Sequence, residues 1–280
     1  MNNVNPSVAI EHNRRAVRLL QRHFSGWSPL TPARRSSAWV SAWATSAGPV
    51  HVKTHAAKRK YMQEKQAYLR WSKFVRTPRL LDYDDLDHSM LLSTVHGQHG
   101  QIAPLPLAAH RAAGRWLRTL HSIRVVDDDP LPWTEALQRR IEALRRRAAG
   151  RVEPETLERR LNPALELVAR PTPFGRVPCH RDFEPRNWIY DGVRLSVIDF
   201  EHARLDAPAW DFTRMATTCW LDNEQARVAF RDGYGPVDAE FWAWVNALQQ
   251  LDALSTYVWG LTHKDPKFMA RGQRSLRGHR

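Results

Sequence analysis

The sequence predicts an α+β protein with two unlike lobes, a small N-terminal lobe built on a β-sheet and a larger, mostly helical C-terminal lobe. Short strand-like segments, rich in β-branched and aromatic residues, cluster early in the chain. Segments with helical periodicity dominate afterwards. Gly97 and Gly100 punctuate the chain where this change occurs. Because strands and helices are segregated, we expect an N-terminal lobe over residues 1–96 and a C-terminal lobe over residues 97–280.

The N-terminal lobe begins with a predicted amphipathic helix. Pro29 and Pro32 prevent this helix from continuing, since proline lacks the amide hydrogen that a helix needs. Two strands joined by a turn at Gly48 and Pro49 follow, and then a helix and two further strands. The expected ranges are helix 8–24, strands 39–44 and 50–54, helix 56–73, and strands 79–83 and 89–95.

The C-terminal lobe is predicted to be mainly helical. A short strand pair interrupts the helices and turns at Asp191-Gly192. The segment from Arg271 to Arg280 is expected to be a loose basic tail. The expected ranges are helices 107–123, 133–149, 155–169, 224–232 and 240–260, and strands 187–190 and 195–198.

Composition is that of a globular protein in a reducing compartment. The 280 residues are 42% hydrophobic, which is enough to bury a core. The sequence contains no run of 18 apolar residues, so no membrane span is expected. The first eleven residues lack the apolar stretch of a secretion signal. The two cysteines, Cys179 and Cys219, fit a reduced protein. We expect a cytoplasmic monomer or homodimer without a membrane partner.

The net charge of +13 has two interpretations. It indicates either an anionic partner, such as nucleic acid, or a solvated surface rich in arginine. Many arginines lie in helix-like runs with apolar residues between them, which favours the solvated surface. Nucleic acid is therefore not the expected partner, and a strongly basic chain is a poor host for a polycationic substrate.

One segment combines residues suited to phosphoryl transfer. Asp182 and Asn187 lie five residues apart, and Asp199 follows a short apolar run that predicts a strand. Carboxylate and amide oxygens are the hard ligands that Mg²⁺ prefers. Phosphoryl transfer needs one group to orient the attacking hydroxyl and others to hold the metal ion. A chance match on an ordinary loop is the alternative interpretation.

The order of these residues resembles a known family. His180-x-Asp182 with Asn187, followed by Ile198-Asp199, is similar to the catalytic and metal-binding segments of the aminoglycoside phosphotransferase family, whose members are protein-kinase-like kinases of small molecules. The stretch Asp206 to Phe212 resembles the segment that follows the metal-binding aspartate in that family. The resemblance covers roughly residues 30 to 260 and implies a protein-kinase-like fold.

The resemblance also implies roles for individual residues. Asp182 would be the catalytic base, and Asn187 and Asp199 would hold magnesium. His180 and Asp211 would support the catalytic loop. Many family members have glycine where this chain has Arg181.

A lysine and a glutamate in the first lobe fit the same resemblance. Lys53 ends the predicted strand from Val50, and Glu64 lies on the following helix. The family pattern pairs them, with Lys53 on the α- and β-phosphates of the nucleotide. The alternatives are a surface lysine and an ordinary i,i+4 pair between Glu64 and Lys60.

The expected phosphate-covering loop departs from the family pattern. The candidate, residues 32–38, contains no glycine. Either the backbone amides of this segment or the hydroxyls of Ser36 and Ser37 are expected to contact the nucleotide phosphates in its place, with Arg34 and Arg35 as additional candidates.

The predicted function is transfer of the γ-phosphate of ATP, with Mg²⁺ as cofactor and GTP as an alternative donor, to a hydroxyl of a small molecule. The acceptor is expected to be an antibiotic, neutral or nucleoside-like rather than a polycationic aminoglycoside. The alternatives are a metabolic kinase for a sugar or an amino alcohol, and a non-catalytic kinase-like protein that binds a partner through its arginines.

Overall fold

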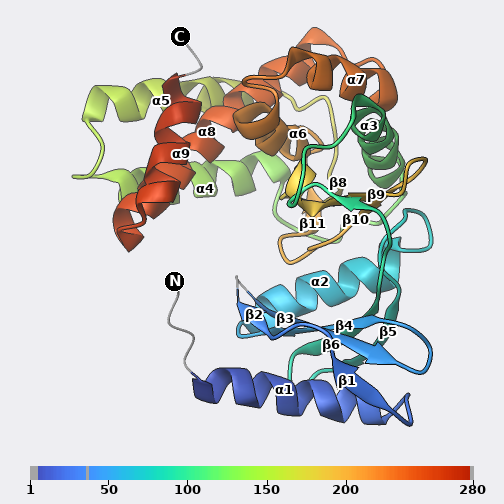
Figure 1. The fold of residues 1–280 in the computed structure, drawn as a ribbon. Coiled ribbons are helices and arrows are strands. Elements are labelled where there is room, and N and C mark those ends of the chain that lie inside the picture. The colour runs from blue at the N-terminus through green and yellow to red at the C-terminus, as the bar shows by residue number, and fades with distance from the viewer. Residues whose placement is uncertain (1–5, 36–37, 278–280) are drawn as a thin grey trace. The chain divides into compact units, whose positions relative to one another are not determined.

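Two units make up the fold in this computed structural model, which describes residues 6–35 and 38–277 (Figure 1). The first unit is formed by Met1–Ala103 together with Asn187–Ala203. The second is formed by Pro104–Arg186 together with Arg204–Arg280. The chain therefore leaves the second unit after Arg186 and returns to it at Arg204.

An antiparallel sheet with strand order β1-β3-β4-β6-β5 forms the centre of the first unit, and β2 also pairs with β3. In Figure 1 this sheet lies between α1 and α2. The elements are α1 (Pro6–Gln21), β1 (Trp27–Pro29), β2 (Arg34–Arg35), β3 (Ala38–Thr45), β4 (Val50–His55), α2 (Lys58–Trp71), β5 (Leu80–Asp84) and β6 (Ser89–Ser93).

The apolar face of α1 covers one face of this sheet. Leu19 and Leu20 of α1 are almost completely buried, and they share a cluster with Val52 of β4 and Leu91 of β6. Each fully buried leucine or valine stabilises the fold by roughly 1.5–3 kcal/mol relative to an exposed one. The amphipathic pattern that predicts this helix is therefore the pattern that attaches it to the sheet.

A second, three-stranded sheet joins residues 187–203 to the first unit. Its order is β10 (Leu195–Val197), β9 (Trp188–Tyr190) and β7 (Gln98–His99). Gln98 pairs with Tyr190, and the amide of Val197 donates to the carbonyl of Arg76. The predicted division at residues 96/97 differs from these units, because backbone pairing attaches a hairpin from the second half of the chain to the N-terminal segment.

Helices dominate the second unit, with one two-stranded sheet formed by β8 (Val177–Cys179) and β11 (Arg204–Asp206). Glycines let α3 and α7 approach closely: a Cβ on Gly114 would lie 2.1 Å from the carbonyl oxygen of Phe230. The helices are α3 (Leu107–His121), α4 (Trp133–Ala148), α5 (Pro154–Val168), α6 (Trp210–Arg214), α7 (Glu224–Tyr234), α8 (Ala239–His263) and α9 (Pro266–Arg277).

The prediction of a loose basic tail is wrong for residues 271–277, which belong to α9. This helix packs on α8 through small residues: a Cβ on Gly272 would meet the backbone and Cβ of Tyr257 within 2.7 Å. Ser275 is buried and its hydroxyl donates to the carbonyl of Thr217. Residues 278–280 lie outside the described residues.

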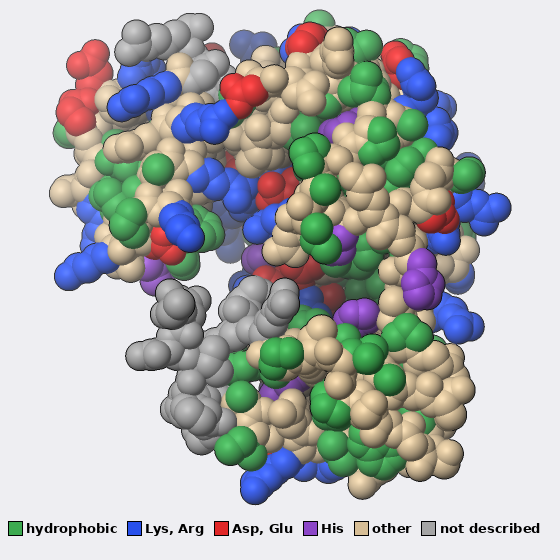
Figure 2. All heavy atoms as spheres, in the orientation of Figure 1, with side chains coloured by type: hydrophobic (Ala, Val, Ile, Leu, Met, Phe, Trp, Pro, Cys, Tyr) green, Lys and Arg blue, Asp and Glu red, His purple; other side chains and the backbone are tan. Residues whose placement is uncertain are grey.

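The arginines of the second unit are spread over its surface, as expected for solvated side chains. In Figure 2, basic side chains appear at many separate places on the visible face of this unit, and acidic side chains lie among them. Within the described part of the chain, no helix is both long and apolar enough to cross a bilayer.

Candidate active site

A buried lysine connects three elements of the first unit. Lys53 lies on β4, Glu64 lies on α2, and Asp199 follows β10. Lys53 Nζ lies 2.7 Å from Glu64 Oε2 and 2.5 Å from Asp199 Oδ1. The Lys53 side chain is 9% exposed and that of Glu64 is fully buried, whereas that of Asp199 is 31% exposed. One end of this chain of charges therefore reaches solvent.

Electrostatics keep the Lys53 ammonium and the Glu64 carboxylate charged at neutral pH. Burial alone would raise the pKa of Glu64, but the charge of Lys53 and the hydrogen bond with His55 lower it to about 2. Burial alone would lower the pKa of Lys53, but the carboxylates of Asp199 and Glu64 raise it above its usual value. The cluster thus presents a fixed ammonium beside a partly exposed carboxylate.

His55 extends this cluster and was not predicted. Its Nε2 lies 2.8 Å from Glu64 Oε2, and its Nδ1 lies 3.9 Å from Glu201 Oε2. Glu64 pairs with Lys53, and Lys60 pairs with Glu201 at 2.9 Å. The alternative i,i+4 pair between Glu64 and Lys60 is therefore not formed. The sequence signal that indicates His55 is its two-residue spacing from Lys53, because residues 53 and 55 of one strand point to the same face.

The β9–β10 hairpin brings Asn187 and Asp199 together. Asn187 immediately precedes β9, and Asp199 follows β10 by two residues. The amide of Ile198 donates to the carbonyl of Asn187 at 3.0 Å. Asp199 has φ of 70°, a left-handed conformation that is uncommon outside glycine. A carboxylate and a carboxamide at one hairpin end are hard-oxygen donors that suit Mg²⁺.

The loop after β8 holds Asp182 in the second unit. Asp182 is only 5% exposed. Its amide donates to His180 Nδ1 at 3.3 Å, so the His180 ring takes this contact as an acceptor. Phe183 anchors the loop by stacking on Trp116 of α3 with ring centroids 5.5 Å apart.

Asp211 fixes the backbone of this loop from α6. Its carboxylate accepts hydrogen bonds from the amides of His180 at 2.8 Å and Arg181 at 2.5 Å. Arg181 has φ of 68°, and these bonds hold that uncommon conformation. His121 Nε2, 3.1 Å from Asp211 Oδ2, supports the carboxylate and was not predicted.

Arginines surround the Asp182 carboxylate. Arg186 donates to Asp182 Oδ2 at 2.7 Å, and Arg214 Nε lies 3.5 Å from Asp182 Oδ1. The surrounding ionic cluster contains three basic and three acidic side chains, so its formal charge is balanced. Its members are Arg186, Arg214, Arg271, Asp182, Glu184 and Asp252.

Ser36 and Ser37 lie outside the described residues, so their predicted phosphate contacts stay predictions. In the sequence they fall between β2 and β3, which pair with each other. The backbone on either side therefore belongs to the sheet.

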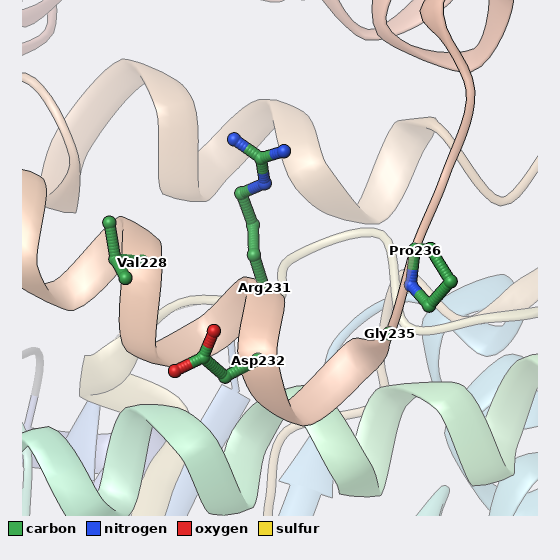
Figure 3. A pocket seen from close by; sticks show the side chains of 5 residues that line it. All are labelled: Val228, Arg231, Asp232, Gly235 and Pro236. Carbon is green, nitrogen blue, oxygen red and sulfur yellow. The ribbon is translucent and has the colours of Figure 1, made fainter.

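A pocket elsewhere in the second unit contains none of the predicted site residues. It lies along α7 and the loop after it, and it is lined by Val228, Arg231, Asp232, Gly235 and Pro236 (Figure 3). The charged residues in it already have partners: Arg231 lies over the Trp242 ring and Asp232 pairs with Arg111.

Comparison with known families identifies the fold and the chemistry. A model of the phosphotransferase enzyme family matches residues 25–263, which is most of the chain. The chain belongs to this family. The predicted family and enzyme class, a small-molecule kinase, are confirmed. No curated protein sequence matches the chain.

Solved structures confirm the protein-kinase-like two-lobed fold of this phosphotransferase. A choline/ethanolamine kinase family protein from Mesorhizobium loti has a TM-score of 0.70 at 17% identity, over 95% of this chain and 98% of that one. The GDP and kanamycin complex of APH(2")-IIia has a TM-score of 0.69 at 15% identity, over 94% and 97%. A macrolide 2'-phosphotransferase type I has a TM-score of 0.66 at 14% identity, over 94% and 96%. At such identities the likeness concerns the fold alone.

Proposed function

We propose that this phosphotransferase moves the γ-phosphoryl group of ATP to a hydroxyl of a small molecule in a magnesium-dependent reaction. The observation that supports it best is the buried Lys53–Glu64 pair with Asp199 at its solvent-facing end. A buried ion pair adds little net stability, because the desolvation penalty offsets the attraction, so a role in binding phosphate explains this lysine better than stability does. GTP is an alternative donor.

Lys53, Asn187 and Asp199 would serve the nucleotide. Lys53 would contact the α- and β-phosphate oxygens, and Glu64 would keep the Lys53 ammonium oriented and charged. Asn187 and Asp199 would hold Mg²⁺, which when bound neutralises charge on the β- and γ-phosphates. Ser36 and Ser37 are retained as phosphate contacts. A non-catalytic binding protein would have no use for these nucleotide- and metal-binding residues, so that alternative is disfavoured.

Asp182 would orient the acceptor hydroxyl and take its proton. A base needs a fixed position before it needs a tuned pKa. Asp211 and His180 support that position through hydrogen bonds to the loop backbone and to the Asp182 amide. Asn187 follows Asp182 by five positions in the sequence, so one short segment of the chain would supply both the base and a metal ligand.

The acceptor we propose is a neutral or nucleoside-like antibiotic, and the phosphorylation would inactivate it. Two arginines already contact Asp182, and the ionic cluster around it has no excess of negative charge. A polycationic aminoglycoside gains little from such surroundings. The same argument weighs against choline-like cations, so a sugar is the better metabolic alternative.

A phosphorylation screen tests this proposal. The purified protein would be incubated with Mg²⁺, with ATP or GTP, and with hydroxylated antibiotics and metabolites grouped as neutral, cationic and anionic. We expect a phosphorylated product from a neutral or nucleoside-like acceptor. Fast turnover of a polycationic aminoglycoside would reject the acceptor class. Absence of both phosphoryl transfer and nucleotide-induced thermal stabilisation would reject the kinase. A cytoplasmic setting, where ATP is available, fits the two free cysteines.

A further inference from the structure

A buried carboxylate in the second unit is contacted by three guanidinium groups. Asp206, at the end of β11, is fully buried. Its Oδ2 lies 2.8 Å from Arg140 NH1, 2.9 Å from Arg204 Nε and 3.4 Å from Arg181 Nε. Three positive charges from α4, β11 and the loop after β8 therefore converge on one oxygen atom. We call these three arginines the Asp206 cluster.

The second carboxylate oxygen of Asp206 also has hydrogen-bond donors. Its Oδ1 accepts from Trp133 Nε1 at 2.7 Å and from the Ala207 amide at 3.0 Å. One negative charge thus faces three positive charges, an excess of two. Among the described residues Asp211 forms no ion pair with these arginines; its carboxylate contacts the His180 and Arg181 amides and His121 instead.

A fourth arginine does not change this balance. Arg176 is near enough to Arg140 to lower its pKa, after the larger effect of burial and against the opposing effect of Asp206. Arg176 has acidic partners of its own, Asp127 at 2.9 Å and Asp129 at 3.3 Å. The excess therefore belongs to the Asp206 cluster itself.

The cluster has donors that the described residues do not use. The Arg181 side chain is 13% exposed and its guanidinium lies 3.8 Å over the Trp210 ring. Its Nε and NH1 atoms are buried, with no hydrogen-bond partner among the described residues. Arg140 and Arg204 are 34% and 30% exposed, so solutes can reach them. Buried guanidinium donors without acceptors are unfavourable, and an anion would supply those acceptors.

We propose that the Asp206 cluster is a binding site for a phosphate group, either inorganic phosphate or the phosphate monoester of a small molecule. A phosphate dianion matches the excess of two positive charges and offers several oxygens to forked guanidinium donors. The site is distinct from the surroundings of Asp182 described above. Since Arg181 directly precedes Asp182 in the chain, bound phosphate would also stabilise the loop that holds Asp182.

Thermal unfolding in phosphate compared with chloride at equal ionic strength tests this site. We expect phosphate to raise the Tm of the wild-type protein saturably. Arg140→Gln and Arg204→Gln should each weaken phosphate binding about tenfold, the value of one charge-assisted hydrogen bond. Arg139→Gln is the matched control, because Arg139 is the neighbouring residue of α4 and pairs only with the exposed Glu135 among the described residues. It should leave phosphate binding unchanged.

Asp206→Asn separates a phosphate site from a purely structural cluster. This variant removes the one negative charge, so phosphate should bind it more tightly and raise its Tm more than that of the wild type. Comparison of inorganic phosphate with glycerol phosphate identifies the source, since tighter binding of the monoester indicates a metabolite. The proposal is overturned if neither stabilises the wild type or Asp206→Asn beyond chloride, or if Arg140→Gln responds as the wild type does.

Discussion

At the scale of single residues, Glu64 connects the two sides of the nucleotide half of the candidate site. Its Oε2 contacts Lys53 and His55, and its Oε1 accepts from the amide of Phe200 at 3.3 Å. One carboxylate therefore orients the lysine and also holds the backbone next to Asp199. Because it is fully buried, its charge is stable only while these partners are present.

Glu64→Gln should lower the free energy of unfolding by about 3–5 kcal/mol at pH 7, because it leaves a buried lysine with one carboxylate fewer. The folded pKa of Glu64 is about 2, below the ordinary 4.5. Its contribution is therefore present above pH 4.5 and is lost as the pH falls towards 2. Denaturant unfolding of both proteins at pH 7, 4 and 3 measures this difference.

Glu135→Gln is the control for that experiment, because it breaks an exposed pair with Arg139. It should change the free energy of unfolding by less than about 1 kcal/mol. Equal effects of the two substitutions would contradict the special role of the buried carboxylate.

Asp182→Ala should reduce turnover by about two to four orders of magnitude, the usual contribution of a positioned base. Nucleotide binding should be nearly unchanged, because the proposed nucleotide contacts come from other residues. Steady-state kinetics with the acceptor found in the screen measures the loss. A folded variant with near-normal turnover would remove Asp182 from the proposed role.

At the scale of secondary-structure elements, a polar contact fastens α1 to the sheet beside its apolar face. His12 Nδ1 lies 3.0 Å from the Thr54 hydroxyl and its Nε2 lies 2.8 Å from the Ser41 hydroxyl. Both hydroxyls belong to strands of the sheet, β4 and β3. Burial, with a smaller effect of the Arg15 charge, lowers the pKa of His12 to about 4.

This histidine predicts acid sensitivity of the first unit. Its folded pKa lies below the ordinary 6.5, so the unfolded chain binds the proton more readily. Stability should fall by about 3 kcal/mol between pH 6.5 and 4 through this group, at 1.4 kcal/mol per pKa unit. His12→Gln should remove that slope while retaining a hydrogen bond. Unfolding curves at pH 7, 6, 5 and 4 check this, and an unchanged slope in the variant would contradict it.

The contact between α3 and α7 predicts an intolerance of any side chain at Gly114. A Cβ there would lie 2.1 Å from a backbone oxygen, so the helices must separate. Gly114→Ala should lower the free energy of unfolding by about 1–3 kcal/mol, the usual cost of overpacking. Gly175→Ala is the matched control, since a Cβ at that position meets nothing within 4 Å. Comparable stabilities of the two variants would refute this packing argument.

Elements with strong periodicity were predicted well, as was the short β9–β10 hairpin with its Asp191-Gly192 turn, but several other short elements were missed. The expected helix over 107–123 is α3, Leu107–His121, and the expected strand over 50–54 is β4, Val50–His55. The three-residue strands β8 and β11 and the five-residue α6 were not predicted. Their sequences are too short to show a period, and their pairing partners lie far along the chain.

At the scale of the whole molecule, the proposed chemistry requires a divalent metal ion. Chelation of Mg²⁺ should abolish phosphoryl transfer, and its re-addition should restore it. Asp199→Asn should raise the Mg²⁺ concentration needed for half-maximal activity, because a carboxamide binds the ion more weakly. The control is Asp191→Asn, at the exposed turn of the same hairpin. Turnover that persists in chelator would contradict the proposed metal dependence.

The sequence by itself determined the order of the chemical groups and the fold class. The spacing of Asp182, Asn187 and Asp199 and the segregation of strands from helices are local properties, and the solved structures agree with the fold class. Only the tertiary structure decided that His55 and His121 support Glu64 and Asp211, and that three arginines share Asp206. These contacts join residues from separate elements, and burial decides their strength. No local pattern in a sequence records which distant charges will be enclosed together.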